Sequence, residues 1–511
     1  MRERKRVSSC TQIMKKLVSL YNNSPITLSA FTGLHYLGIP HLRGNILMGR
    51  LSQVGDKLGD EILCAGQLAI EHPSGMCFEY IGPTKIVLLI TKPEHIHQVM
   101  QYDRKGEIIR KKPILKAFSH VFGDNIFSSE GAEWKSQRKM YKSYFIAKPS
   151  LKKLVPEMQM AINSHIETEQ NPIYTVELTK FCIDLAMNVI AITRMGTGIL
   201  SRDSLQELQL ELAKAMREVS DYRNDVKIKM SEKLHYLSFT GATTKAKSDL
   251  HRQFIKHITN ETHTDHILQT DNLLRMTAAS TANKIPEEVA AEDLQSERTL
   301  CDGSFLLLAG HETTSKLIQF VLMTLSVRPD ILQQIEDELV AVDMSAMTLD
   351  DIKNQLPYLN KVLNEALRLY PPVPVFAREV MQDFMIDDIP VRKGTVVMVA
   401  PLVTHQREDV AGPNPKIFNP NRWNEAENPN LYAPSAFIPF GDGARACVGK
   451  DFAFLEAAIA ITTLVNKFNF RLQTKPGQNS EYLFETRFEG TLKPAHDVPM
   501  TFTNKRSTPN L

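Results

Sequence analysis

The chain has 511 residues, of which 43% are hydrophobic and 23% charged, and its 60 basic and 58 acidic residues leave a net charge of +2. This composition is ordinary for a globular protein, and the near balance of charge argues against nucleic-acid binding, which usually needs a strong basic excess. No Gly/Ser-rich or Pro-rich linker divides the chain, so one large domain is expected.

The cysteines show neither the C-x-x-C pairs of zinc sites nor the dense spacing of a disulfide scaffold. They are Cys10, Cys64, Cys77, Cys182, Cys301 and Cys447. A reducing compartment fits this usage best. No apolar run reaches the roughly 18 residues of a transmembrane helix. We therefore expect a cytoplasmic protein without a transmembrane segment, and leave a peripheral membrane contact open.

The first 55 residues contain one acidic residue, Glu3, and several basic ones. Such a segment can be a solvated tail, an acid-poor transit peptide, or a patch that touches anionic lipid. The solvated or peripheral interpretation is favoured, because a charge run is usually a wet surface. We assign residues 1–37 to a basic N-terminal tail and residues 38–511 to a single catalytic domain.

Residues 78–90 form two β-type runs separated by Gly82-Pro83, which predicts a hairpin. A helix is expected to start at Pro93, since proline is tolerated in a first turn. Further on, a loop leads into a helix that carries Trp134 and Arg138 four residues apart, on one face. This pair could hold a carboxylate, or it could be an exposed cation packed on an indole ring.

The middle third of the chain is the least informative. Residues 150–285 predict amphipathic helices, for example over 205–219. The polar, Thr-rich stretch 240–249 is typical of a mobile connection. No chemistry can be assigned to this region from its residues.

A long helix is predicted from about Pro286 to Val327, and Pro329 should begin the next one. It contains Leu-Leu-Ala-Gly-His-Glu-Thr-Thr-Ser over 307–315, an unusual choice for an apolar helix because glycine costs about 1 kcal/mol relative to alanine. Small residues at Ala309 and Gly310 would leave room for dioxygen, Thr313 could hydrogen-bond to it, and Glu312 could deliver protons through water. A second histidine at the spacing of H-E-x-x-H is missing, which excludes a zinc-protease motif.

Residues 358–369 predict a helix with Glu365 and Arg368 three residues apart, ended by Pro371-Pro372. Residues 373–403 read as β hairpins. Near the C-terminus, the string Pro-Phe-Gly-Asp-Gly-Ala-Arg-Ala-Cys-Val-Gly over 439–449 places Cys447 just before an apolar helix. A helix N-terminus stabilises a thiolate, and glycines let the backbone approach a planar partner, so a thiolate metal ligand is indicated. An isolated cysteine is otherwise more often an apolar filler.

This string resembles the heme-binding signature of the cytochrome P450 family, with Phe440, Gly443, Arg445, Cys447 and Gly449 in place. The sequence over 309–314 is similar to the oxygen-activation motif of that family. The resemblance covers nearly the whole chain from about Gly38. It implies a mostly α fold with minor β sheets, the cytochrome P450 fold, and heme b (iron protoporphyrin IX) as the cofactor, with Cys447 ligating the iron.

Further roles follow from the resemblance alone. Trp134 and Arg138 look like a heme-propionate clamp, with Arg378 as another propionate partner and Arg445 close to the ligand. Glu365 and Arg368 look like the E-x-x-R pair, which Arg422 would complete as a structural triad. His405 could lie near the propionate group or be an ordinary loop histidine, which is the commoner case.

The function that this resemblance implies is insertion of one oxygen atom from O2 into a C–H bond of a hydrophobic small molecule, a fatty acid or other lipid-like compound being favoured. Electrons must come from a separate partner, a ferredoxin, a flavodoxin or a P450 reductase, because no nucleotide-binding fingerprint follows Cys447. Lys139, Lys142 and Lys450 are its candidate docking cations. A peroxide-driven or isomerising enzyme would not need Thr313 and its acid. A heme carrier or gas sensor is the non-enzymatic alternative.

Phe127 lies seven residues before Trp134, in a loop that resembles the one from which related fatty-acid hydroxylases project an aromatic ring over the heme. We expect Phe127 to contact the substrate. A core position without access to the substrate is the equal alternative at this point.

Overall fold

The computed structural model describes most of the chain. The described residues are 41–42, 58–81, 85–106, 108–109, 118–119, 121–145, 148–167, 172–224, 247, 249–254, 257, 261–269, 272–340, 342, 348–474 and 480–505. The proposed basic tail, residues 1–37, and most of the polar stretch 240–249 lie outside them. Among the described residues, none of the helices is both long enough and apolar enough to cross a bilayer.

Helices make up most of the described chain, as the sequence predicts. Their bounds are α3 Leu58–Glu71, α4 Pro93–Lys105, α6 Gly131–Phe145, α7 Lys148–Glu167, α8 Leu178–Met195, α9 Arg202–Asn224, α12 Glu261–Gln269, α13 Leu273–Ala282, α14 Ala291–Leu294, α15 Glu297–Val327, α16 Pro329–Leu339, α17 Leu349–Asn354, α18 Pro357–Leu369, α19 Pro401–Thr404, α20 Glu408–Ala411, α21 Lys450–Lys467 and α22 Ser480–Leu483. Short 3-10 turns add η2 Pro286–Glu288, η4 Pro420–Trp423, η5 Pro429–Tyr432 and η6 Gly443–Arg445.

The strands form one large sheet and three small ones. Their bounds are β1 His41–Leu42, β2 Met76–Ile81, β3 Lys85–Ile90, β4 Ile108–Ile109, β5 Ile173–Glu177, β6 Phe376–Val380, β7 Phe384–Ile386, β8 Ile389–Val391, β9 Val396–Val399, β10 Phe468–Leu472, β11 Thr486–Glu489, β12 Thr491–Pro494 and β13 Pro499–Asn504. The large sheet has the order β1-β2-β3-β9-β6-β4, and the small sheets are β10-β13-β5, β11-β12 and β7-β8.

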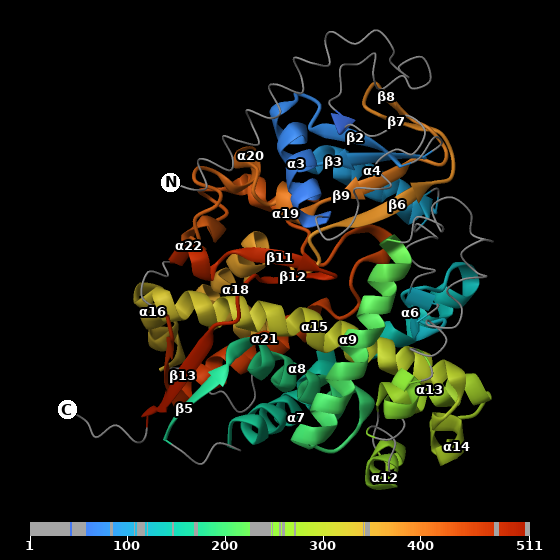
Figure 1. The fold of residues 1–511 in the computed structure, drawn as a ribbon, viewed down its shortest axis with the longest axis vertical. Helices are drawn as coiled ribbons and strands as arrows, with labels where there is room; N and C mark the ends of the chain where they lie inside the picture. The colour runs from blue at the N-terminus through green and yellow to red at the C-terminus, as the bar shows by residue number, and fades with distance from the viewer. Residues whose placement is uncertain are drawn as a thin grey trace.

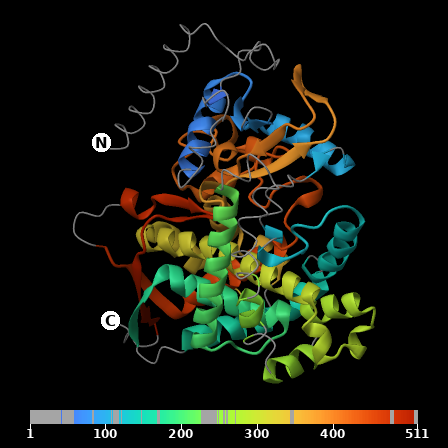
Figure 2. The same ribbon diagram turned by 45° about the vertical axis from the view of Figure 1, so that its right-hand side comes forward.

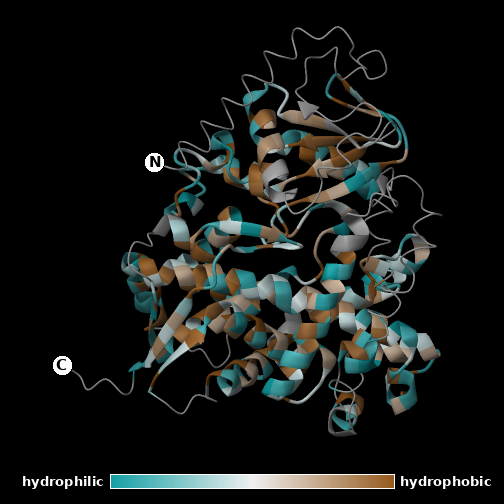
Figure 3. Cartoon of the chain, in the orientation of Figure 1, coloured by the Kyte–Doolittle hydropathy of each residue, from teal (hydrophilic) through white to brown (hydrophobic). Residues whose placement is uncertain are grey.

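The predicted hairpin over 78–90 is present, with β2 and β3 antiparallel and Ile81 opposite Lys85. The strand-rich part lies at the top of Figure 1 and the helical part below it, and the turned view of Figure 2 shows the same division. The strands of the large sheet are mostly brown in Figure 3, which agrees with the apolar run Lys85–Ile90.

The long helix differs from the prediction at its start. Helix α15 begins at Glu297, not near Pro286, because Ser296 caps it by accepting a hydrogen bond from the Thr299 N–H. The preceding acidic residues belong to η2 and α14 instead; Asp293, for example, accepts from the Ala290 N–H within α14. The predicted end at Val327, followed by a helix from Pro329, is correct.

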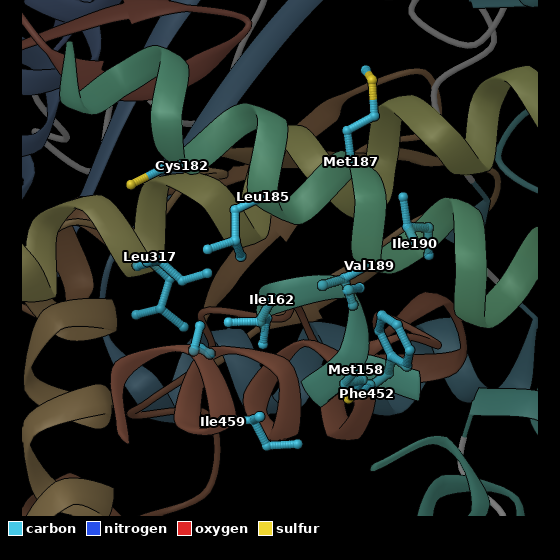
Figure 4. Packing of buried hydrophobic residues seen from close by; sticks show 14 of the residues in the cluster. Met158, Ile162, Cys182, Leu185, Met187, Val189, Ile190, Leu317, Phe452 and Ile459 are labelled. Atoms are coloured by element: carbon cyan, nitrogen blue, oxygen red, sulfur yellow. The ribbon is translucent and has the colours of Figure 1, made fainter. Parts of the chain in front are cut away.

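Helix α15 crosses the middle of the molecule (Figure 1) and packs against α8, α21 and α18. Figure 4 shows the buried cluster in which these elements meet α7; it includes Ile162, Leu185, Leu317 and Ile459. Burial of each such side chain contributes roughly 1.5–3 kcal/mol. This core holds α15 and the segment before α21 in fixed relative positions.

Candidate functional site

The loop before Cys447 is closed by a backbone hydrogen bond of 2.8 Å from the Cys447 N–H to the Phe440 carbonyl. Gly441 and Gly443 both have positive φ, +70° and +77°, which side chains rarely adopt. At Gly443 a Cβ atom would also lie 2.3 Å from Asp103 Oδ2. Glycine is therefore required at this position by both its dihedral angle and its neighbour.

Cys447 lies three residues before α21, whose N-cap is Gly449. Burial raises the pKa of the Cys447 thiol, while a hydrogen bond from the Gly449 N–H and the charges of Arg138 and Lys450 act to lower it. Cys447 nevertheless keeps exposed surface, so other protein atoms do not cover it completely. Within the described ranges no group of three or more His, Cys, Asp or Glu residues is placed to hold a metal ion.

Arg138 reaches this loop from α6. Its guanidinium donates a hydrogen bond of 2.7 Å to the carbonyl of Ala446, the residue before Cys447. Its Nε atom is buried and has no hydrogen-bond partner among the described residues. This donor is therefore available to an anionic group bound beside the loop.

Trp134 and Arg445 contact one another, so that the guanidinium carbon of Arg445 lies 3.8 Å from the centre of the indole ring. Arg445 also donates to the Ser129 carbonyl at 3.0 Å. Burial lowers the pKa of Arg445 to about 10, and the nearby charges of Arg378 and Arg138 act in the same direction. The Arg378 and Arg138 charges thus disfavour the charge of Arg445, and the three guanidinium groups together would bind anionic groups.

Arg378, on β6, is held by a carboxylate that the sequence analysis missed. Its Nε atom lies 3.0 Å from Asp103 Oδ1, and both side chains are almost fully buried. The other oxygen of Asp103 accepts from the Ala444 N–H at 3.0 Å. Asp103 therefore joins α4, β6 and the cysteine loop. Its position near the end of an ordinary helix provided no sequence signal.

On α15, the Thr313 hydroxyl donates to the Ala309 carbonyl at 2.9 Å, so its oxygen is left as an acceptor towards any further group. The missing side chain of Gly310 faces Ile190 of α8, where a Cβ would approach to 2.8 Å, so glycine allows the two helices to pack closely. His311 is buried and its Nδ1 contacts the Leu307 carbonyl. Burial lowers its pKa, which agrees with a neutral histidine inside the core.

The Glu312 carboxylate contacts two groups. Its Oε1 accepts from the Thr491 hydroxyl at 2.7 Å and lies 3.7 Å from the Lys316 ammonium. Burial by itself would raise the pKa of Glu312, but the Lys316 charge, the Thr491 hydrogen bond and the Lys493 charge lower it below its usual value. Glu312 is therefore ionised at neutral pH.

The structure brings Glu365, Arg368 and Arg422 together. Arg368 donates two hydrogen bonds of 2.8 Å to the Glu365 carboxylate, and the Arg422 Nε atom lies 3.4 Å from it. Trp423, which the sequence analysis did not single out, donates from its indole at 3.0 Å. Loss of one member of such a buried network typically costs about 3–5 kcal/mol.

His405 connects this network to the cysteine loop. Its carbonyl accepts from Arg368 at 3.0 Å, and its Nε2 accepts from the Ile438 N–H at 2.9 Å. Burial lowers the pKa of His405 to about 3, and the Arg368 charge acts in the same direction, so the ring stays neutral. The structure thus favours the loop-histidine alternative over a neighbour of the propionates.

Phe127 belongs to an aromatic cluster. Its ring stacks on Phe305 of α15 with 5.1 Å between ring centres and packs edge-on against Phe118 at 4.9 Å. The loop is attached to α15 by a hydrogen bond of 3.0 Å from the Ile126 N–H to Asp302. Phe305 precedes Ala309 by one helical turn, so Phe127 lies along the helix that carries the proposed oxygen-handling residues.

These observations fit the heme that the sequence implies. Cys447 keeps exposed surface, a buried arginine donor and a cluster of guanidinium groups are available for propionates, and α15 supplies small and polar residues. Lys139 and Lys142 of α6 and Lys450 at the start of α21 are exposed near the same loop.

Comparison with known proteins agrees with this geometry. The family model described as "Cytochrome P450" matches residues 41–495. The chain is 26% identical to Cytochrome P450 72A397 of Kalopanax septemlobus, over 77% of this chain and 76% of that protein. It is also 26% identical to Cytochrome P450 52A5 of Candida maltosa, covering 83% of each, and to Cytochrome P450 3A29 of Sus scrofa, covering 86% and 88%.

Proposed function

The chain belongs to the cytochrome P450 family, whose members are heme-thiolate monooxygenases, and from this premise we propose that it hydroxylates a fatty acid or another lipid-like molecule. The observation that carries the substrate class is the stacking of Phe127 on Phe305, one helical turn before Ala309. Aromatic rings beside the reacting position provide apolar surface for an alkyl chain, and each buried methylene stabilises binding by about 0.8 kcal/mol.

Heme b, when bound, supplies the oxidation chemistry, in which O2, two electrons and two protons give one hydroxylated C–H bond and one water. Cys447 would ligate its iron, and the N-terminus of α21 and the Gly449 N–H would stabilise the thiolate. Arg138, Arg445 and Arg378 would bind the propionates, with Trp134 supporting Arg445. Phe440, Gly443 and Gly449 would shape the loop against the ring.

Residues of α15 would manage dioxygen and protons. Ala309 and Gly310 are the small residues of α15 that precede Thr313 by about one turn. The Thr313 hydroxyl would hold dioxygen in place. Glu312 would take protons from solvent and pass them inward through water. This step moves protons only, so the electrons must arrive by another route.

A separate electron-transfer protein would supply those electrons. Lys139, Lys142 and Lys450 are exposed on the side of the cysteine, where a negatively charged ferredoxin, flavodoxin or reductase surface would dock. We assign catalysis to residues 38–511 as one domain and treat residues 1–37 as a basic tail. A cytoplasmic location with peripheral membrane contact is part of the same proposal.

Optical titration of the ferric protein with fatty acids, sterols and terpenes tests the substrate class. Displacement of water from the heme by medium- or long-chain fatty acids, and products that contain one added oxygen, would support the proposal. A response to sterols or terpenes alone would overturn the fatty-acid assignment. Turnover with peroxide but not with NAD(P)H and redox proteins would favour the peroxide-driven alternative, and CO binding without any turnover would favour a carrier or sensor.

A further inference from the structure

Glu312 is held from two directions. The Thr491 hydroxyl reaches it from β12, and the Lys316 ammonium reaches it from one turn further along α15. Thr491 is 7% exposed and the Lys316 side chain 1% exposed, whereas the Glu312 side chain is 23% exposed. The Glu312 carboxylate is therefore more accessible than Thr491 and Lys316, which are both buried.

Burial of an unpaired ammonium group is strongly unfavourable. Lys316 is on the face of α15 that meets α8, where the Glu177 carboxylate is a further group that stabilises its charge. The Glu312 charge stabilises the Lys316 ammonium more strongly than Glu177 does. Among the described residues, Glu312 is also the carboxylate that forms an ion pair with Lys316. Attachment of α15 to α8 does not require this lysine, because Gln319 already donates to Thr179 at 2.9 Å.

The charged groups around Glu312 come from two elements. Lys316 and His311 lie on α15, and Lys493 lies on β12, where it is paired with Glu489 at 2.5 Å. The ammonium groups of Lys316 and Lys493 act to lower the pKa of Glu312, and Lys316 contributes the most. On the hairpin side, the Glu312 charge acts to raise the pKa of Glu489.

The hairpin tip that carries Thr491 is itself in contact with another helix. Gly490, with φ +82°, lies against Met216 of α9, whose Cε would be 2.9 Å from an added Cβ. Figures 1 and 2 show α9 running across the end of this hairpin. Gly490, which contacts α9, is therefore adjacent in sequence to Thr491, which donates the hydrogen bond to Glu312.

We propose that Lys316 and Thr491 are positioning residues that hold the Glu312 carboxylate for proton delivery. The proposal rests on the proposed role of Glu312 in oxygen activation. Glu312 gives one proton to a water that leads inward and takes one back from solvent, with no change in electron count. Lys316 keeps the carboxylate charged between transfers, and Thr491 directs one oxygen while the other stays available.

Infrared spectroscopy of the resting ferric protein tests Lys316 without turnover. In Lys316→Met a carboxyl band of protonated Glu312 should appear, with its pH midpoint raised by about 1 to 3 pH units over the parent. The band should be absent from Lys316→Met/Glu312→Gln, and Lys316→Arg should restore the parent midpoint. Lys467→Met, which removes a partly buried lysine bonded to Asn163, is the matched control. An unchanged Glu312 midpoint in Lys316→Met would overturn the role of Lys316.

Thr491 is tested by the partition of reducing equivalents between product and hydrogen peroxide. Thr491→Val should shift this partition towards peroxide with little change in substrate affinity, and Thr491→Ser should restore it. Thr501→Val removes a comparable hydroxyl, bonded to Thr175 at 2.8 Å in another sheet, and should behave like the parent. If Thr491→Val divides reducing equivalents between product and hydrogen peroxide as the parent does, the role of Thr491 is overturned. Failure of the parent to consume NAD(P)H with substrate would instead overturn the proposed function, while the infrared result would still stand.

Discussion

Arg138 donates a hydrogen bond of 2.7 Å to the carbonyl of Ala446, and its Nε donor is buried without a partner beside the proposed heme ligand. The hydrogen bond to Ala446 orients the Arg138 guanidinium. Its Nε donor then remains available to a bound group. Burial lowers the pKa of Arg138, although the Cys447 sulfur acts to raise it. An anionic propionate would satisfy both the donor and the charge.

The first prediction concerns this residue. Arg138→Met should speed the loss of heme by roughly 10-fold or more, because a hydrogen bond to a charged group is worth about 1.5–3 kcal/mol. The measurement is the rate of heme transfer to an excess of a heme-scavenging protein. Lys139→Met removes the exposed neighbouring charge and should leave the rate unchanged. Equal rates for Arg138→Met and the parent would remove Arg138 from heme binding.

Ligation by Cys447 predicts a red-shifted Soret band in the ferrous CO complex, as thiolate ligation gives. Cys447→His should abolish that band while heme content is checked separately. Cys182→Ala, at a fully buried cysteine on α8, is a suitable control and should keep the band. Survival of the band in Cys447→His would mean that another residue is the ligand.

Thr313→Ala should leave heme and substrate binding intact but divert reducing equivalents into hydrogen peroxide. The reason is that its hydroxyl, which donates to the Ala309 carbonyl in this structure, is proposed to turn and donate to dioxygen until protons arrive. Thr313→Ser keeps the hydroxyl and should remain closer to the parent. The ratio of product to NAD(P)H consumed is the measurement, and an unchanged ratio in Thr313→Ala would exclude this role.

Phe127→Ala should move the position of hydroxylation along a fatty acid while the CO spectrum stays intact. The ring stacks on Phe305, so its removal opens space beside α15 into which a chain can shift. Phe127→Leu should produce a smaller change. The product regioisomer ratio decides the matter; the same ratio in all three proteins, or no turnover of any fatty acid by the parent, would refute the substrate proposal.

His405 should make the protein less stable as the pH falls. Burial holds its pKa at about 3 against an ordinary value of 6.5, so below pH 6.5 the unfolded chain binds a proton that the folded chain does not. The loss grows as the pH falls from 6.5 towards 3 and should reach about 2 kcal/mol at pH 5. Urea unfolding at pH 7 and pH 5 should show a smaller difference for His405→Gln than for the parent. An equal difference would show that His405 does not titrate in this way.

Local sequence determined a large part of the site. The glycines around Cys447, the Pro371-Pro372 pair after α18 and the two β runs around Gly82-Pro83 act over a few residues, so the loop, the helices and the hairpin of β2 and β3 could be predicted. Glu365 and Arg368 share one helix turn and were recognisable for the same reason. The predicted start of the long helix was wrong because Ser296 offers a local cap that competes with continued helix.

The tertiary structure alone decided which distant groups complete the site. Asp103, Trp423, Thr491 and His405 lie on four separate elements, and their contacts with Arg378, Glu365, Glu312 and Ile438 bridge large distances in sequence. Lys316 is one turn from Glu312, yet its significance depends on burial against α8. Such contacts arise when packed helices and strands bring side chains together, and no periodicity or motif within one segment encodes them.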